Sequence, residues 1–124
     1  MSKRAIVLFA HGARSASWRA PFERLAELVA ARNPDAAVSL AFLELMEPRL
    51  PEAVHAAIAA GAEAVSIVPI FLGQGGHVLR DLPPLVADLR AAHPQVPIAL
   101  AEAVGENAAV LEAIAAYCSA PKLV

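Results

Sequence analysis

The stretch Ala5-Ile6-Val7-Leu8-Phe9-Ala10-His11-Gly12 is the part of the sequence from which the fold can be argued. Six apolar residues follow one another and stop at a histidine and a glycine, without the polar alternation of a strand that has one face in water. Such a run is typical of a strand covered on both faces in a parallel sheet. Residues 18–32 then place apolar side chains at helical spacing and end at Asn33-Pro34, as expected of a helix that follows the strand.

Strand and helix patterns alternate along the rest of the chain. We expect strands at residues 5–10, 38–43, 64–70 and 97–101, and helices at residues 18–32, 50–60, 77–92 and 106–118. Pro83-Pro84 should confine regular helix to the part of the third helix after them and leave residues 77–82 as a separate turn. The alternation indicates βαβ units with right-handed crossovers. The sequence therefore predicts an α/β fold, a three-layer sandwich around a central parallel four-stranded sheet.

Length and composition predict one domain and argue against several classes of partner. With 124 residues, 58% of them hydrophobic and 18% charged, residues 1–124 should form a single domain that buries some apolar surface against another chain. The net charge of −2 and the lack of a basic run argue against nucleic acid. The first apolar run is too short to cross a membrane and lacks a signal cleavage site, so we expect a cytoplasmic protein without a membrane partner. The single cysteine, Cys118, is interpreted as a buried or incidental thiol.

Unusual polar residues follow the predicted strands, at the edge where ligands bind in parallel α/β sheets. His11 follows the first strand, Glu44 ends the second, and His77 closes the loop after the third. A spacing of 33 residues separates His11 from Glu44, and the same spacing separates Glu44 from His77, which is about one βα unit. We therefore expect His11, Glu44 and His77 to lie on one rim as candidate metal ligands and catalytic groups.

Each of these residues also has a purely structural interpretation. Either histidine could simply hydrogen-bond a loop. Glu44 could cap the next helix or pair with Arg49, and Glu47 is close enough to take over either role. Glu102, after the fourth strand, either ends that strand or orients a ligand from outside the metal's own coordination sphere. His55 in mid-helix and His93 at a helix end are not assigned to the site.

The loop Gly73-Gln74-Gly75-Gly76 before His77 allows two interpretations. Glycines let backbone amides approach an anion at a helix N-terminus, which would suit a phosphate. However, the segment lacks the lysine and hydroxyl of a GxxxxGK[ST] loop, and it is not a GxGxxG turn after the first strand. A flap over a large planar ligand fits equally well and would place Gly75 and Gly76 against the substrate.

Three segments together carry a family resemblance. The first is Val7-Leu8-Phe9-Ala10-His11-Gly12-Ala13-Arg14, similar to a strand followed by an HGSR turn, with Ala13 where serine is common. The second is Phe42-Leu43-Glu44-Leu45-Met46-Glu47-Pro48, similar to an FLE…P segment. The third is Val68-Pro69-Ile70-Phe71-Leu72-Gly73-Gln74-Gly75-Gly76-His77-Val78, similar to P-x-FL…G-x-H. In this order they resemble the small sirohydrochlorin cobaltochelatases of the CbiX type.

The resemblance implies a chelatase-like half domain that inserts a divalent metal into sirohydrochlorin without ATP, in tetrapyrrole and cobalamin biosynthesis. Cobalt is the first expectation for the metal, with iron and nickel as alternatives. Metal handling and catalysis fall on His11, Glu44 and His77. Larger relatives carry two such domains in one chain, so a chain of this length is expected to form a homodimer.

The residue types suit this chemistry. A metal must lose water, be held in an open coordination sphere, and pass to ring nitrogens that have lost their protons. One histidine can accept a pyrrole proton near neutral pH while the other groups hold the metal. Sirohydrochlorin also carries many carboxylates, for which Arg14 and Arg80 are the candidate substrate-binding side chains, with Arg49 nearby. The alternative for these arginines is a solvated surface.

Other functions would use some of the same residues. A phosphohistidine carrier domain would use His11 and leave Glu44 and His77 without a role. A non-catalytic metal-binding or tetrapyrrole-binding protein would use all three without turnover. A histidine phosphatase is disfavoured because Ala10 stands where its arginine-histidine pair should begin.

Overall fold

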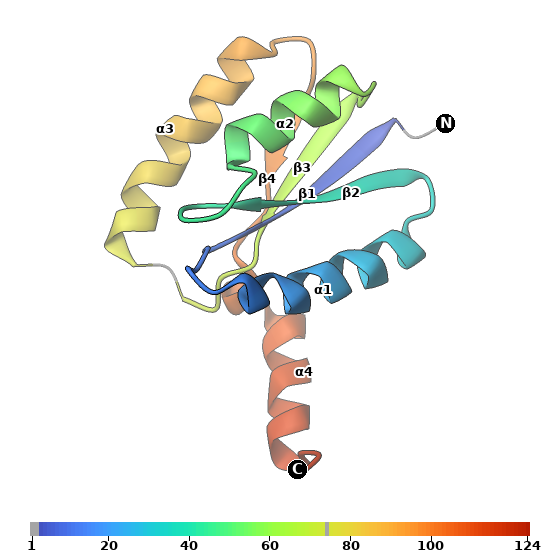
Figure 1. Cartoon of the computed structure of the whole chain (residues 1–124), viewed down its shortest axis with the longest axis vertical. Helices are drawn as coiled ribbons and strands as arrows, with labels where there is room; N and C mark the ends of the chain where they lie inside the picture. The colour runs from blue at the N-terminus through green and yellow to red at the C-terminus, as the bar shows by residue number, and fades with distance from the viewer. Residues whose placement is uncertain (1–2, 74) are drawn as a thin grey trace.

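The computed structural model describes residues 3–73 and 75–124, apart from the side chains of His77 and Leu79. Strands and helices alternate as the sequence predicts (Figure 1). The strands are β1 (Arg4–Ala10), β2 (Ala36–Phe42), β3 (Ala64–Pro69) and β4 (Ile98–Leu100). The helices are α1 (Arg19–Arg32), α2 (Leu50–Ala59), α3 (Gly76–Ala92) and α4 (Ala108–Ser119). Two 3-10 turns, η1 (Ala16–Trp18) and η2 (Val104–Glu106), precede α1 and α4.

The strands form one parallel sheet in the order β2-β1-β3-β4, which confirms the predicted sheet. The register pairs Ala10 with Phe42 and Phe9 with Pro69, so β1, β2 and β3 end at the same edge. The chain leaves β1 toward β2 on one side and later returns to β3 on the other side. Ligands of open α/β sheets bind at such a reversal, beyond the carboxyl ends of the strands.

Helices cover both faces of the sheet, which confirms the three-layer sandwich. Figure 1 places α2 and α3 on one side of the sheet and α1 on the other. The main core lies on the side of α2 and α3, where alternate residues of β1 and β3 point toward these helices. The core contains Val7, Phe9, Val65 and Ile67 from the sheet and Val54 from α2, all less than 2% exposed.

The prediction that Pro83-Pro84 would break the third helix is wrong. α3 is continuous from Gly76 to Ala92 with both prolines inside it. Val78 and Leu82 before the prolines, like Val86 after them, are buried in the same core. Both prolines are exposed, so their rings lie on the solvent side of the helix and leave the core contacts intact. Packing on both sides of the prolines therefore outweighs the lost hydrogen bonds.

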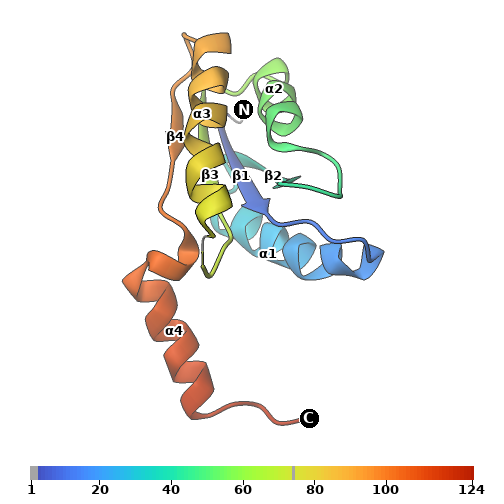
Figure 2. The same cartoon turned by 90° about the vertical axis from the view of Figure 1, so that its left-hand side faces the viewer.

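The last helix lies apart from the rest of the fold. Figures 1 and 2 show α4 projecting away from the sheet and from the other helices, and none of its residues is buried. Cys118 is consequently exposed, so of the two interpretations given to it, a buried or an incidental thiol, the buried one is wrong. Among the described residues, no helix combines the length and the apolar character needed to cross a membrane.

Candidate functional site

The pairing of β1 with β2 brings together two of the three predicted site residues. The ladder continues past the strand ends, because the Leu43 amide donates to the Ala10 carbonyl at 2.8 Å. His11 and Glu44 follow these two positions, and His11 Nδ1 lies 3.2 Å from Glu44 Oε1. The two side chains are 43% and 41% exposed, so the pair stands at the surface of the rim and is accessible to a ligand.

A tight turn holds Glu44 in this place. The Met46 amide donates to the Glu44 carbonyl at 2.8 Å, which closes a three-residue turn around Leu45. Leu45 has a φ of 69°, in the left-handed region that a leucine rarely adopts. Such a γ-turn is strained, and strain of this kind occurs where the fold fixes a functional group. Leu45 itself is exposed, so its conformation is not explained by packing in the core.

Gly12 allows the two strand ends to approach each other. A Cβ built on Gly12 would lie 1.8 Å from the Glu44 carbonyl oxygen, which belongs to the backbone and cannot simply rotate away. Only glycine fits at this position without a shift of one of the two segments. The His11-Gly12 sequence is therefore a packing requirement of the rim.

Substitution of Gly12 by alanine should separate the His11 and Glu44 segments. We expect a loss of unfolding free energy of about 1–3 kcal/mol, the range for overpacking a tight contact. Metal insertion should fall because the His11–Glu44 contact is lengthened. Urea unfolding and an insertion assay would test both effects. Gly75→Ala is the matched control for the urea measurement alone, since a Cβ at Gly75 meets nothing within 4 Å. Equal stability of the two variants would contradict the packing role of Gly12.

His11 is held by two aromatic side chains to which the sequence assigned no role. The Trp18 indole N–H donates to the His11 carbonyl at 2.7 Å. The ring of Phe71, from the segment after β3, lies 4.6 Å from the His11 ring between centroids. Phe71 is 2% exposed and makes an edge contact with Phe9. Phe71 stands in the third motif and Trp18 begins the predicted first helix, but neither position by itself indicates a contact with His11.

One oxygen of the Glu44 carboxylate has no protein partner. Glu44 Oε1 contacts His11, whereas Oε2 is buried and makes no hydrogen bond to any described residue. A buried carboxylate oxygen without a donor is unfavourable unless a cation or a proton reaches it. The carboxylate therefore suits a site that binds a cation or a proton and releases it again.

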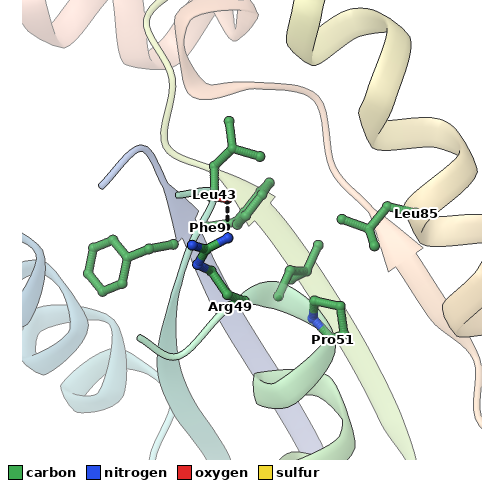
Figure 3. A pocket seen from close by; sticks show the side chains of 7 residues that line it. Phe9, Leu43, Arg49, Pro51 and Leu85 are labelled. Carbon is green, nitrogen blue, oxygen red and sulfur yellow. Dashed lines mark hydrogen bonds between the residues drawn. The ribbon is translucent and has the colours of Figure 1, made fainter. Parts of the chain in front are cut away.

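An apolar pocket opens beside the segment that carries Glu44. It has a volume of about 260 Å³ and lies between the strand ends, the start of α2 and α3 (Figure 3). Its lining residues are Phe9, Phe42, Leu43, Arg49, Leu50, Pro51 and Leu85. Arg49 is the only charged residue among them, and it donates from Nη1 to the Leu43 carbonyl at 3.3 Å. The rim thus combines a polar pair with apolar surface and one guanidinium.

The remaining predicted site residues are distributed along the same edge. Arg14 is exposed in the loop between β1 and η1, and Arg80 is exposed with Nε 3.6 Å from Asp81 Oδ1. Gly75 caps α3 and Gly76 begins it, and a Cβ on either would meet open space. His77 is the second residue of α3, but its side chain lies outside the described residues, as does Gln74 of the loop. Among the side chains that are described, no three His, Cys, Asp or Glu gather into a metal site.

The alternatives weighed for other polar residues are partly resolved. Glu102 accepts a hydrogen bond from Asn107 Nδ2 at 2.8 Å, so it supports the start of α4. Glu52, not Glu44, accepts from the amide that precedes α2, at 3.4 Å from Arg49 N. His55 and His93 contact each other at 2.5 Å between Nδ1 and Nε2, on α2 and after α3.

Comparison with known proteins identifies the family. The sequence model of the CbiX family matches residues 5–119. The sirohydrochlorin cobaltochelatase of Methanocaldococcus jannaschii is 38% identical over 89 residues, which are 72% of this chain and 62% of that protein. The crystal structure of the CbiX protein of Marinobacter aquaeolei VT8 has a TM-score of 0.79 and 37% identity, covering 94% of each chain. The sirohydrochlorin chelatase SirB of Bacillus subtilis subspecies spizizenii, solved in complex with cobalt, has a TM-score of 0.78 and 25% identity over 94% of this chain and 50% of SirB.

The chain spans about three fifths of the length of the curated relatives it matches. The family match begins in β1 and ends in the last residue of α4, and it includes His11, Glu44 and the segment after β3. The chain therefore belongs to the CbiX family.

Proposed function

We propose that this chain is a chelatase that inserts a divalent metal ion, cobalt in the first place, into sirohydrochlorin without ATP. The observation that carries the proposal is the His11–Glu44 pair on the rim, with one carboxylate oxygen buried and unpaired. The names of the relatives support the substrate and the metal, because they include a sirohydrochlorin cobaltochelatase and a sirohydrochlorin chelatase in complex with cobalt. The metal is a substrate of this reaction and leaves with the product.

The geometry suggests how the pair would work. When Nδ1–H of His11 donates to Glu44, the other ring nitrogen, Nε2, carries a lone pair for a metal ion or a proton. Two pyrrole protons must leave the macrocycle for each divalent ion that enters. We assign one of these protons to His11, which is exposed enough to pass it to water. His77 is the proposed second acceptor or ligand.

A site with few protein ligands favours transfer over storage. A closed tetrahedral site of four side chains would hold the metal as structural zinc sites do. An imidazole and a carboxylate leave most coordination positions to water and then to the ring nitrogens. Glu44 would hold the metal ion next to the macrocycle. While the ion is bound, it would supply the partner that the buried Oε2 otherwise lacks.

The macrocycle would lie on apolar surface beside this pair. Large apolar side chains are exposed close in sequence to the site residues, namely Trp18 at 41%, Leu45 at 54% and Leu72 at 67%. Exposed apolar groups that gather at one edge mark binding surfaces. We propose that they contact the tetrapyrrole faces, while Gly75 and Gly76 allow its close approach to the loop.

The arginines at the rim are proposed to bind the carboxylates of the substrate. Arg14→Ala and Arg80→Ala should each raise the KM for sirohydrochlorin by about 10-fold to 150-fold, the loss of a hydrogen bond to a charged group. The single-turnover rate should change little, because such a contact is made equally in the ground and transition states. Arg32→Ala, at the opposite end of α1, is the control and should leave KM unchanged. A fall in the single-turnover rate with unchanged KM would contradict the binding role.

Pairing of two copies belongs to the same proposal. The chain matches about half of SirB, and we propose that a second copy takes the place of the other half. Light scattering at micromolar concentration should therefore report about twice 12.9 kDa. A monomer that retains full insertion activity would contradict this part of the proposal.

An absorbance assay with sirohydrochlorin and cobalt, iron or nickel in turn tests the function. We expect repeated turnover to the metallated product, fastest with cobalt. Binding of metal or tetrapyrrole without released product would favour the non-catalytic binding protein instead. Transfer of phosphate to His11 from a phosphohistidine donor, with no metal insertion, would favour the carrier domain.

A further inference from the structure

Two histidines outside the rim face each other from neighbouring helices. His55 lies in the middle of α2, and His93 is the residue that caps the C-terminal end of α3. His55 Nδ1 and His93 Nε2 are 2.5 Å apart, while the ring centroids are separated by 4.7 Å and the ring planes are inclined by 52°. The two rings therefore meet through their nitrogens and do not stack face to face. His55 is exposed and His93 is half-buried, so a small ion can reach the pair from solvent.

The backbone on which the two histidines stand is fixed by the core. Val54, next to His55, is completely buried. The His93 amide donates to the carbonyl of Leu89 at 3.1 Å, and Leu89 is buried in the same core as Val54. The Val96 amide in turn donates to the His93 carbonyl at 3.1 Å, which closes the turn after α3. Because both side chains start from fixed positions, binding a ligand between them costs little additional ordering of the chain.

The geometry of the two rings suits a metal ion bound between them. A hydrogen bond between two imidazole nitrogens requires one ring to donate and the other to accept. A transition metal ion instead uses a lone pair from each neutral ring at the same time. In a tetrahedral site, metal–nitrogen bonds of about 2.0–2.1 Å place the two nitrogens about 3.3 Å apart. The rings would have to open by about 1 Å from the observed 2.5 Å, which small rotations of two surface side chains provide.

We propose that His55 and His93 form a second metal site, which binds a divalent transition metal ion such as nickel or zinc and joins α2 to the end of α3. Imidazole ligands favour ions of this class, whereas magnesium and calcium require oxygen ligands. Among the described side chains, no third His, Cys, Asp or Glu joins the pair, so water fills the other coordination positions. The bound ion stabilises the packing of α2 against α3.

The length of α3 separates this site from the rim. α3 begins at Gly76, in the loop after β3, and its 17 residues form a helix about 25 Å long. His93 follows the last of these residues, at the end of α3 that points away from the rim. An ion held there is too far from His11 to enter a macrocycle bound at the rim. The second site therefore takes no part in metal insertion, and it does not rest on the proposed function.

Calorimetric titration of the untagged chain with nickel(II) alone tests the second site. His11→Ala removes the histidine of the rim, and this variant should still bind nickel through the histidine pair. Adding His55→Gln or His93→Gln should weaken that binding by more than about 10-fold, because even a residue outside the coordination sphere is worth about 10-fold to 100-fold in metal affinity. Glutamine keeps a side chain that can hydrogen-bond the remaining histidine but removes the imidazole ligand. Equal nickel affinity of His11→Ala with and without His55→Gln would overturn the proposal.

Thermal unfolding distinguishes joint binding by the pair from binding to single surface histidines. The two histidines are 38 positions apart in the sequence, so an ion that needs both stabilises only the folded chain. With free nickel at about 100 times its Kd, the Tm of His11→Ala should rise by at least about 5 °C, and by less than about 1 °C once His55→Gln is added. The same rise in both variants would overturn the proposal. An increase in molar mass on addition of nickel, measured by light scattering, would indicate an ion bound between copies and would overturn it as well.

Discussion

Replacing His11 by alanine should lower the rate of metal insertion into sirohydrochlorin by about 100-fold or more, the scale for a lost acid–base or ligand group. The substitution removes the imidazole that lies 3.2 Å from Glu44 and leaves that carboxylate without its described partner. Tetrapyrrole binding should survive, because the exposed apolar side chains of the rim are unchanged. Single-turnover absorbance with cobalt, together with macrocycle affinity by fluorescence quenching, would measure the two effects.

Companion variants separate the roles at the rim. Glu44→Gln keeps the shape and an acceptor for His11 but removes the charge, so metal delivery should weaken by about 10-fold to 100-fold while the fold and macrocycle affinity stay near wild type. His77→Ala should match His11→Ala if His77 is the second acceptor. His55→Ala, on α2 away from the rim, is the control and should insert metal at the wild-type rate. Wild-type insertion by both His11→Ala and His77→Ala would show that the site assignment is wrong.

Replacing Phe71 by alanine should have the largest effect on stability, about 3–5 kcal/mol of unfolding free energy. Phe71 is 2% exposed, packs edge to face on Phe9 at 5.6 Å and covers the His11 ring. The alanine variant would leave a cavity between the core and the site. Urea denaturation followed by circular dichroism would report the loss as a lower midpoint.

A conservative variant keeps the role of Phe71 testable if the alanine variant does not fold. Phe71→Leu retains most of the apolar volume and should cost less than about 1.5 kcal/mol. It removes the ring that positions His11, so insertion should still fall while the KM for the tetrapyrrole changes little. An unchanged insertion rate in Phe71→Leu would limit Phe71 to a role in the core.

The strands and the rim could be predicted because their signals are local. The apolar run of β1 requires cover on both faces, and a parallel sheet brings the ends of its strands to one edge. The contact of His11 with Glu44 follows from the register that pairs Ala10 with Phe42. The pairing of two adjacent strands was therefore enough to predict the contact between His11 and Glu44.

Features that depend on packing between distant segments could not be predicted. The continuity of α3 through Pro83-Pro84 depends on core contacts on both sides of the prolines, which local propensity does not include. The direction of α4 depends on Gly105, whose amide donates to the Phe71 carbonyl in the segment after β3. Likewise, Trp18 and Phe71 reach His11 only after the turns on either side have formed.

The hydrogen bond from Trp18 to the His11 carbonyl also places a fluorescent side chain beside the proposed site. Trp18 is the only tryptophan in the chain, so all indole emission comes from the edge of the proposed site. A bound tetrapyrrole absorbs in the region where indole emits, and a paramagnetic ion such as cobalt(II) quenches a nearby excited ring. Binding of the macrocycle and binding of the metal would therefore each reduce the emission of Trp18. Stopped-flow fluorescence could give the order of the two binding steps without any added label.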